Sequence, residues 1–262
     1  MIICFASTIF FYSLALILVS SRLLHEDGPN RLAVTVVATI AVVLHAGILG
    51  HAIFSTAGLN FSLTNVISLV IWIIAFIFTA LMFRLRLMVV VPVVYACAIL
   101  SVALLCLVPP AYITHFDLHP ELFAHVVISL IAYSTLLIAS LYAIQLSIIQ
   151  TKLKNKKFDK NPTIPPLLTV EKQLYHLVII GGVLLSIAIA TGFIFLENTF
   201  SNGNGHKAVL SILAWFVYAV MLWQHHTVGC KIRTAVLYTL TGSGLLTLAY
   251  FGARIVKELI FS

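Results

Sequence analysis

Residues Leu122–Ile149 read LFAHVVISLIAYSTLLIASLYAIQLSII, and this stretch decides the fold class of the chain. It contains no Asp, Glu, Lys or Arg, and it exceeds the roughly 20 apolar residues that a helix needs to cross a bilayer. In lipid every backbone N–H and C=O must be paired within the chain, which an α-helix achieves on its own. The stretch therefore predicts a transmembrane helix that is long enough to project from the membrane.

Seven more apolar runs occupy most of the chain. The protein is 61% hydrophobic and 9% charged, whereas a soluble domain has about 25% charged residues. The sequence predicts an all-α, polytopic transmembrane helical bundle of about eight spans, as a single integral membrane domain over residues 1–262. The seventh span is short, and the first is read as retained because it lacks the basic start of a signal peptide. The predicted spans are Ile2–Ser20, Leu32–Phe54, Leu63–Phe83, Leu87–Val108, Leu122–Ile149, Leu174–Leu196, Ala208–Trp223 and Ala235–Val256.

Basic residues are distributed unequally between the predicted loops. Twelve lie in the loops after the first, third, fifth and seventh spans, and three lie on the opposite side. Because cytoplasmic loops carry the excess of Lys and Arg, both termini are predicted to face outward. The segment TKLKNKKFDKNP (151–162) is then a cytoplasmic loop that orients the chain, with contact to anionic lipid or a partner as the alternative. We interpret the net charge of +7 mainly as this orientation signal.

The sequence disfavours several functional classes. No carboxylate lies inside a predicted span and no internal repeat is visible, which argues against an ion-coupled transporter. The four cysteines form no CxxC pair, which argues against a dithiol relay or a zinc site. No nucleophile–base pair or nucleotide motif appears, so ordinary enzyme catalysis is not expected. Nothing interleaves aromatic and basic residues as a nucleic-acid groove would.

The polar chemistry that remains in or beside the spans is mostly imidazole, a common metal and haem ligand. His45 lies near the bilayer middle, roughly nine residues or about 14 Å from the outer end of the second span. A polar ring at that depth costs free energy unless it has a partner, so His45 is predicted to be either an interhelical hydrogen-bond partner or a ligand. The outer-face histidines are His51, His115, His119, His125 and His206, and the cytoplasmic-face histidines are His25, His176, His225 and His226.

Two outer histidines begin spans. His125 opens the fifth span, and Ser129 and Tyr133 are predicted to share its helix face. His206 opens the seventh span and is followed on that helix by Trp215. Two histidines at one depth on different helices can take both axial positions of a haem iron. Aromatic residues such as these could pack on the porphyrin face.

Two cations lie on the same predicted side as these histidines. Lys207 follows His206, and Arg254 lies near the outer end of the eighth span. Both could pair with haem propionates through charge-assisted hydrogen bonds. From the spacing alone, a bis-histidine haem site is one hypothesis among several.

Two long motifs carry a resemblance to a known family. HVVISLIAYSTLLIASLYAIQL, from His125, resembles the fifth span of the cytochrome c assembly family, and HKAVLSILAWFVYAVMLW, from His206, resembles the signature that follows it. LHA around His45 and LTLAYFGARIV around Tyr250 resemble the short YpjD-type, HemX-like branch of that family. The resemblance extends over nearly the whole chain.

The resemblance implies a multi-pass bacterial inner-membrane protein that binds haem b non-covalently and acts in cytochrome c assembly or haem trafficking. His125 and His206 match the outer histidines that ligate the iron in the family, and His45 matches a histidine shared within the short branch. The implied partners are the lipid bilayer, haem and other cytochrome c maturation or membrane proteins, without nucleic acid. The implied chemistry is at most lyase-like haem chaperoning.

One departure from the family keeps other functions open. The loop before His206, ENTFSNGNGHK, has no tryptophan, whereas better-known members carry a tryptophan-rich WWD segment beside their outer histidines. One alternative is a regulatory or accessory membrane protein, HemX-like, acting on tetrapyrrole synthesis or on the stability of a partner. Another is a transporter or modulator of divalent-metal flux, which histidines on both faces permit and the lack of intramembrane carboxylates disfavours.

The basic-residue asymmetry makes the orientation testable. A topology reporter fused after Ser262 is expected to be active only as an outer-face reporter, because the basic loops stay in the cytoplasm. Cytoplasmic activity of the same fusion would overturn either the span count or the polarity.

Overall fold

The computed structural model describes residues 1–23, 25, 28–55, 59–83, 90–107, 113–114, 120–155, 165–195 and 205–252. Within these ranges the chain is an all-α polytopic bundle of eight α-helices, as predicted, with a two-residue strand pair and a closing π-helical turn. Seven helices of the described ranges are long and apolar enough to cross a membrane. Several residues of the sequence predictions lie outside the described ranges: Arg84, Arg86, His115, His119, Lys156, Lys157, Lys160, Arg254 and Lys257.

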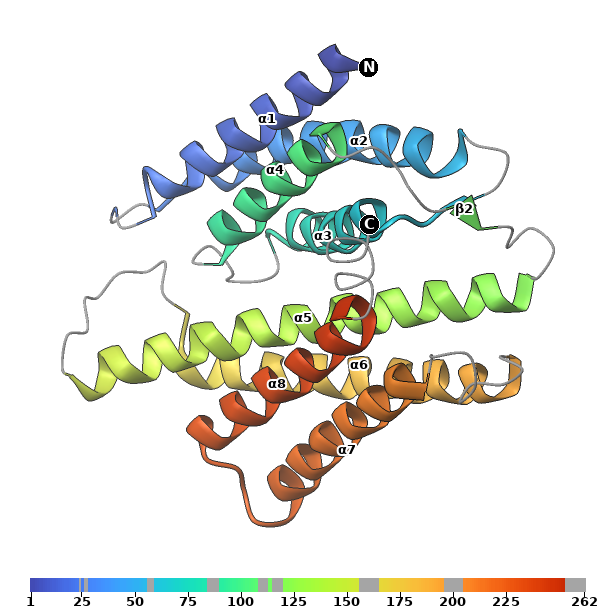
Figure 1. Cartoon of the computed structure of the whole chain (residues 1–262). Helices are drawn as coiled ribbons and strands as arrows, with labels where there is room; N and C mark the ends of the chain where they lie inside the picture. Colours follow the sequence, from blue (N-terminus) through green and yellow to red (C-terminus); the bar gives the residue numbers. More distant parts are fainter. Residues whose placement is uncertain are drawn as a thin grey trace. The chain divides into compact units, whose positions relative to one another are not determined.

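The first four helices form one compact unit, called unit 1 below. Each helix contacts the next along the chain, and the first also contacts the fourth, which closes a four-helix ring (Figure 1). The helices are α1 (Ile2–Ser20), α2 (Arg31–Phe54), α3 (Leu63–Ala80) and α4 (Val91–Leu107).

The last four helices form a second compact unit, called unit 2 below. It repeats the contact order of unit 1: neighbours along the chain pack together, and the first helix packs on the fourth. The elements are α5 (Pro120–Lys154), α6 (Leu167–Phe195), α7 (Gly205–Thr227), α8 (Ile232–Thr247) and the π-helical turn η2 (Leu248–Gly252) (Figure 1). This shared order was not visible as a sequence repeat, because packing order needs no sequence identity between the units.

The helices expose many large apolar side chains and bury several polar ones among their apolar core, as expected of a protein dissolved in lipid. On α1, Phe10 and Ile17 are each 61% exposed, whereas Thr8 and Tyr12 are completely buried. A soluble helix would show the reverse pattern. The arrangement therefore agrees with the membrane assignment made from hydropathy.

Several predicted spans differ in length from the observed helices. The sixth span was predicted to begin at Leu174, but α6 begins seven residues earlier, at Leu167. The prediction of a short seventh span, Ala208–Trp223, was wrong, because α7 has 23 residues. A run of apolar residues stops at the polar His206 and Gln224, but the helix continues through both of them. Among the described residues, the short membrane helix is instead α4, which has 17 residues, because the 16 residues of α8 continue into η2 to give a span of 21 residues.

The connections of unit 1 contain a strand pair that the sequence analysis missed. β1 (Leu59–Asn60) pairs antiparallel with β2 (Ile113–Thr114), with Leu59 opposite Thr114. The pair links the α2–α3 connection to the segment that follows α4. Two-residue strands leave no alternating pattern in the sequence, so periodicity could not reveal them.

Unit 2 contains two close helix approaches at glycines. An added Cβ on Gly181 of α6 would lie 2.6 Å from Leu136 of α5. An added Cβ on Gly242 of α8 would lie 2.6 Å from the Tyr218 ring of α7. Membrane helices pack closely where one of them presents a small residue.

The α7–α8 contact gives a stability prediction with an internal control. Gly242→Ala is expected to destabilise the protein by about 1–3 kcal/mol, because the new methyl group overlaps the Tyr218 ring. Gly244→Ala, on the same helix with nothing within 4 Å of its Cβ position, should be neutral or stabilising. Thermal melting in detergent measures both. Equal melting temperatures for the two variants would contradict the close approach.

Candidate functional site

His125 is fixed at the start of α5 by the facing helix α6. The side chain is half-buried, and its Nδ1 lies 3.0 Å from Thr191 Oγ1. Its ring also lies against Gly192, where an added Cβ would come within 3.0 Å of Cε1. A larger residue at this position would displace the imidazole.

The hydrogen bonds around Thr191 assign the tautomer of His125. The Thr191 hydroxyl donates to the carbonyls of Ile187 and Ala188, at 2.9 and 3.0 Å. With its proton so engaged, the Thr191 oxygen accepts from the Nδ1–H of His125. A neutral imidazole protonated at Nδ1 carries its lone pair on Nε2. Histidines that bind metals show the same arrangement, with the second ring nitrogen donating to a fixed acceptor.

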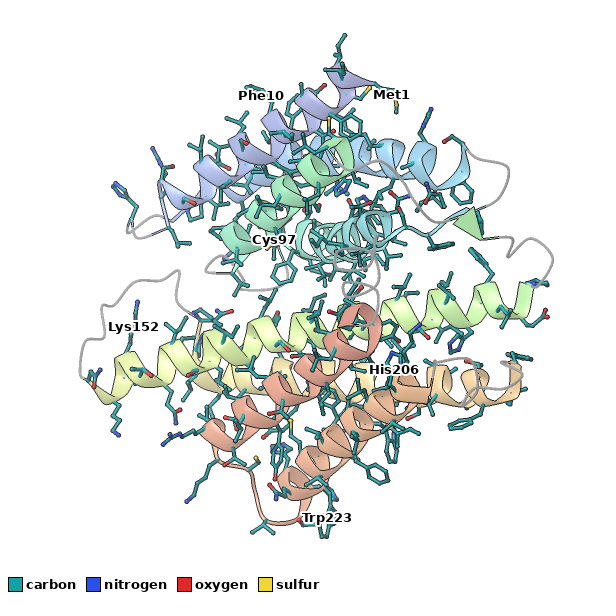
Figure 2. The ribbon with its side chains drawn as sticks, in the orientation of Figure 1. Met1, Phe10, Cys97, Lys152, His206 and Trp223 are labelled. Carbon is teal, nitrogen blue, oxygen red and sulfur yellow. The ribbon has the colours of Figure 1, made fainter. Side chains whose placement is uncertain are left out.

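His206 lies at the same end of unit 2 as His125. α6 ends at Phe195, one turn beyond the partners of His125, and α7 begins at Gly205 after the short connection. Figure 2 shows His206 at this start of α7, with Trp223 near the opposite end of the helix. His206 is exposed and Lys207 is half-buried. Within the described residues, no hydrogen bond joins His125 to His206.

Tyr133 faces a different helix from His125. Its hydroxyl lies 2.9 Å from Thr247 Oγ1 of α8, and its ring packs 5.2 Å from Tyr250 and 5.8 Å from Phe251. The prediction that His125 and Tyr133 share one face was therefore wrong. With 3.6 residues per turn, each step of four residues rotates the direction by about 40°, so eight residues rotate it by about 80°.

Trp215 anchors α7 to α6. Its indole Nε1 donates to Ser186 Oγ at 2.7 Å, and its ring meets Phe216 edge-on at 5.1 Å. Trp215 and His206 are nine residues apart on α7, which places them about 14 Å apart along the helix axis. The structure therefore brings the two histidines to one end of unit 2 and leaves Tyr133 and Trp215 deeper, as packing contacts between helices.

His45 lies in the interior of unit 1 and is completely buried. The Tyr12 hydroxyl of α1 lies 3.2 Å from its Nδ1, and the Ser68 hydroxyl of α3 lies 2.8 Å from its Nε2. Both nitrogens of this ring therefore have hydrogen-bond partners.

The histidines at the opposite end of unit 2 make a contact that the sequence did not indicate. The His225 ring is stacked on Tyr175 of α6, with ring centroids 3.5 Å apart and an interplanar angle of 16°. His176 Nδ1 bonds to the Lys172 carbonyl at 2.7 Å. Among the described residues, no group of three His, Cys, Asp or Glu side chains lies close enough to hold a metal ion.

These features define a polytopic α-helical membrane protein that presents two imidazoles at one end of a four-helix unit. The chain belongs to the cytochrome c assembly family, since the family model described as Cytochrome C assembly protein matches residues 33–261.

Relatives support this assignment. The chain is 43% identical to the inner membrane protein YpjD of Escherichia coli K12 over 251 residues, which cover 95% of each chain. It matches the protein of that name from Escherichia coli O157:H7 equally well. An uncharacterized 28.8 kDa protein of Azospirillum brasilense is 28% identical over 143 residues, which cover 52% of this chain and 51% of that protein. No solved structure matches the chain. With its membrane-spanning helices, the chain is thus a multi-pass bacterial inner-membrane protein.

Proposed function

We propose that this protein binds haem b non-covalently at one end of unit 2 and acts in cytochrome c assembly or haem trafficking. The observation that supports this most directly is the paired placement of His125 and His206 at the same end of α5 and α7. The hydrogen bond from His125 Nδ1–H to Thr191 fits a ligand role, because it leaves the Nε2 lone pair for iron. His125 and His206 would hold the haem, and the bound group would supply an iron centre.

The other predicted site residues take supporting roles in this proposal. Lys207 is next to His206, and with Arg254, which lies outside the described residues, it is assigned to the haem propionates. Tyr133 and Trp215 hold α8 and α7 in place through Thr247 and Ser186. We therefore assign them to the packing that positions the histidines, at the inner boundary of the site.

The family match supports a role in cytochrome c assembly, and the loop between α6 and α7 supports an accessory role as a second candidate. That loop has no tryptophan in residues 196–204, so the aromatic segment that larger members place beside their haem is absent. In the second candidate the haem is a structural or sensing group, and the protein regulates a membrane partner. No catalytic step is assigned in either case.

The ligand assignment predicts a spectrum. Purified protein should show a low-spin Soret band with α and β bands, and a pyridine haemochrome assay should identify haem b. His125→Ala or His206→Ala should abolish or shift this spectrum, because each removes one axial ligand. His51→Ala, which removes an exposed histidine of unit 1, serves as the control. An unchanged spectrum in both single variants would remove this site from consideration.

The Thr191 contact predicts a more selective effect. Thr191→Val removes the acceptor that orients the His125 ring but keeps the shape of the side chain. We expect haem affinity to fall by roughly 10- to 100-fold, the usual effect of losing such a supporting hydrogen bond. Thr191→Ser keeps a hydroxyl and should retain most of the affinity. Haem titration of the two variants measures the difference, and equal affinities would show that the contact does not support a ligand.

A further inference from the structure

Unit 1 contains a histidine that the proposed haem site does not use. His45 of α2 joins three helices, since Tyr12 belongs to α1 and Ser68 to α3. We infer that His45 is the hydrogen-bond hub of unit 1 and not an iron ligand, so that this protein holds its haem iron in unit 2 alone. The statement about haem rests on the proposed function, whereas the statement about the hub does not.

The first argument is the hydrogen-bonding capacity of the ring. A neutral imidazole has one N–H donor and one acceptor nitrogen, and a hydroxyl can serve either of them. Tyr12 and Ser68 therefore satisfy the ring completely, at 3.2 and 2.8 Å. Coordination of iron through either nitrogen would leave one hydroxyl without a partner. Tyr12 and Ser68 are both 0% exposed. A hydroxyl that loses its partner at such a buried position is unfavourable.

The second argument is the packing around the ring. The Tyr12 ring meets the His45 ring edge-on, with centroids 5.8 Å apart and an interplanar angle of 89°. Tyr12 also packs 5.8 Å from Tyr95 of α4, whose hydroxyl lies 3.1 Å from Thr79 of α3. Hydrogen bonds and ring contacts thus connect His45, directly or through Tyr12, to all four helices of unit 1.

Small residues close the same interior. Ala15 on α1 and Ala38 and Ala41 on α2 are all 0% exposed. Small buried side chains let helix backbones approach closely. A planar macrocycle beside His45 would have to separate these helices and break the hydrogen bonds that join them.

His125 differs from His45 in its burial and in its hydrogen-bond partners. It is half-buried near a helix end, and its described hydroxyl partner engages Nδ1. The sequence places His45 near the bilayer middle and His125 at the start of a span, but it does not show which of the two rings is already hydrogen-bonded. Burial and hydrogen-bond partners separate them, and they place the ligand at the end of unit 2.

The hub is tested on full-length protein prepared without haem. Tyr12→Phe and Ser68→Ala each delete one hydrogen bond of His45, and each should lower the melting temperature by roughly 2–6 °C. His51→Gln, at an exposed position on the same helix as His45, is the control and should melt like the parent protein. If both Tyr12→Phe and Ser68→Ala melt like the parent, the hub is wrong.

The absence of an iron ligand in unit 1 is tested on haem-loaded protein with His45→Gln, which keeps a hydrogen-bonding side chain that ligates haem poorly. We expect the haem-to-protein ratio and the Soret band of the parent, and the same for Tyr12→Phe and Ser68→Ala. Loss of haem in His45→Gln, with the haem-free variant melting like the parent, would identify His45 as a ligand and overturn the inference. If the parent protein binds no haem, the proposed function fails, and the melting temperatures alone decide whether His45 is a hub.

Discussion

A polar group inside a lipid bilayer must find its partner within the protein, and the packing of both units follows from this constraint. The indole of Trp72 on α3 donates to the Val42 carbonyl on α2 at 2.9 Å. Other polar side chains of the helix interiors bond to their own helix, as Thr8 does with the Cys4 carbonyl at 2.8 Å. Each interhelical bond fixes the rotation of two helices, because turning either helix would leave a polar group unpaired in lipid. Gln145 is an exception, since its buried amide has no hydrogen-bond partner among the residues that the structure describes.

The same constraint explains why residues available for binding lie at helix ends. An imidazole in the interior must already be paired when the protein folds, as His45 is with Tyr12 and Ser68. Near a helix end, water and lipid headgroups can solvate a ring nitrogen until a ligand arrives. His125 and His206 lie at such ends of α5 and α7. Burial therefore separates a structural histidine from a candidate ligand more clearly than residue type does.

The sequence was enough to locate the helices, but it did not show in which directions their side chains point. Apolar runs located all eight helices of the described chain, because length and hydropathy determine where a chain can cross lipid. They failed at the ends of α7 and at the start of α6, where polar residues continue the helix beyond the apolar run. They also failed for the relative directions of His125 and Tyr133, because a helix rotates slightly with each turn and the facing helix is set by tertiary packing. The stack of His225 on Tyr175 joins residues of α6 and α7 that no spacing rule relates.

The candidate site also bears on what bound haem would do. Its proposed ligands are carried by helices, and His125 is oriented by a hydrogen bond to a third helix, α6, through Thr191. A ligand fixed in this way needs little rearrangement on binding, and a preorganised site binds more tightly for that reason. Within the proposed function, the oriented ring of His125 would lower the cost of binding haem at this end of unit 2.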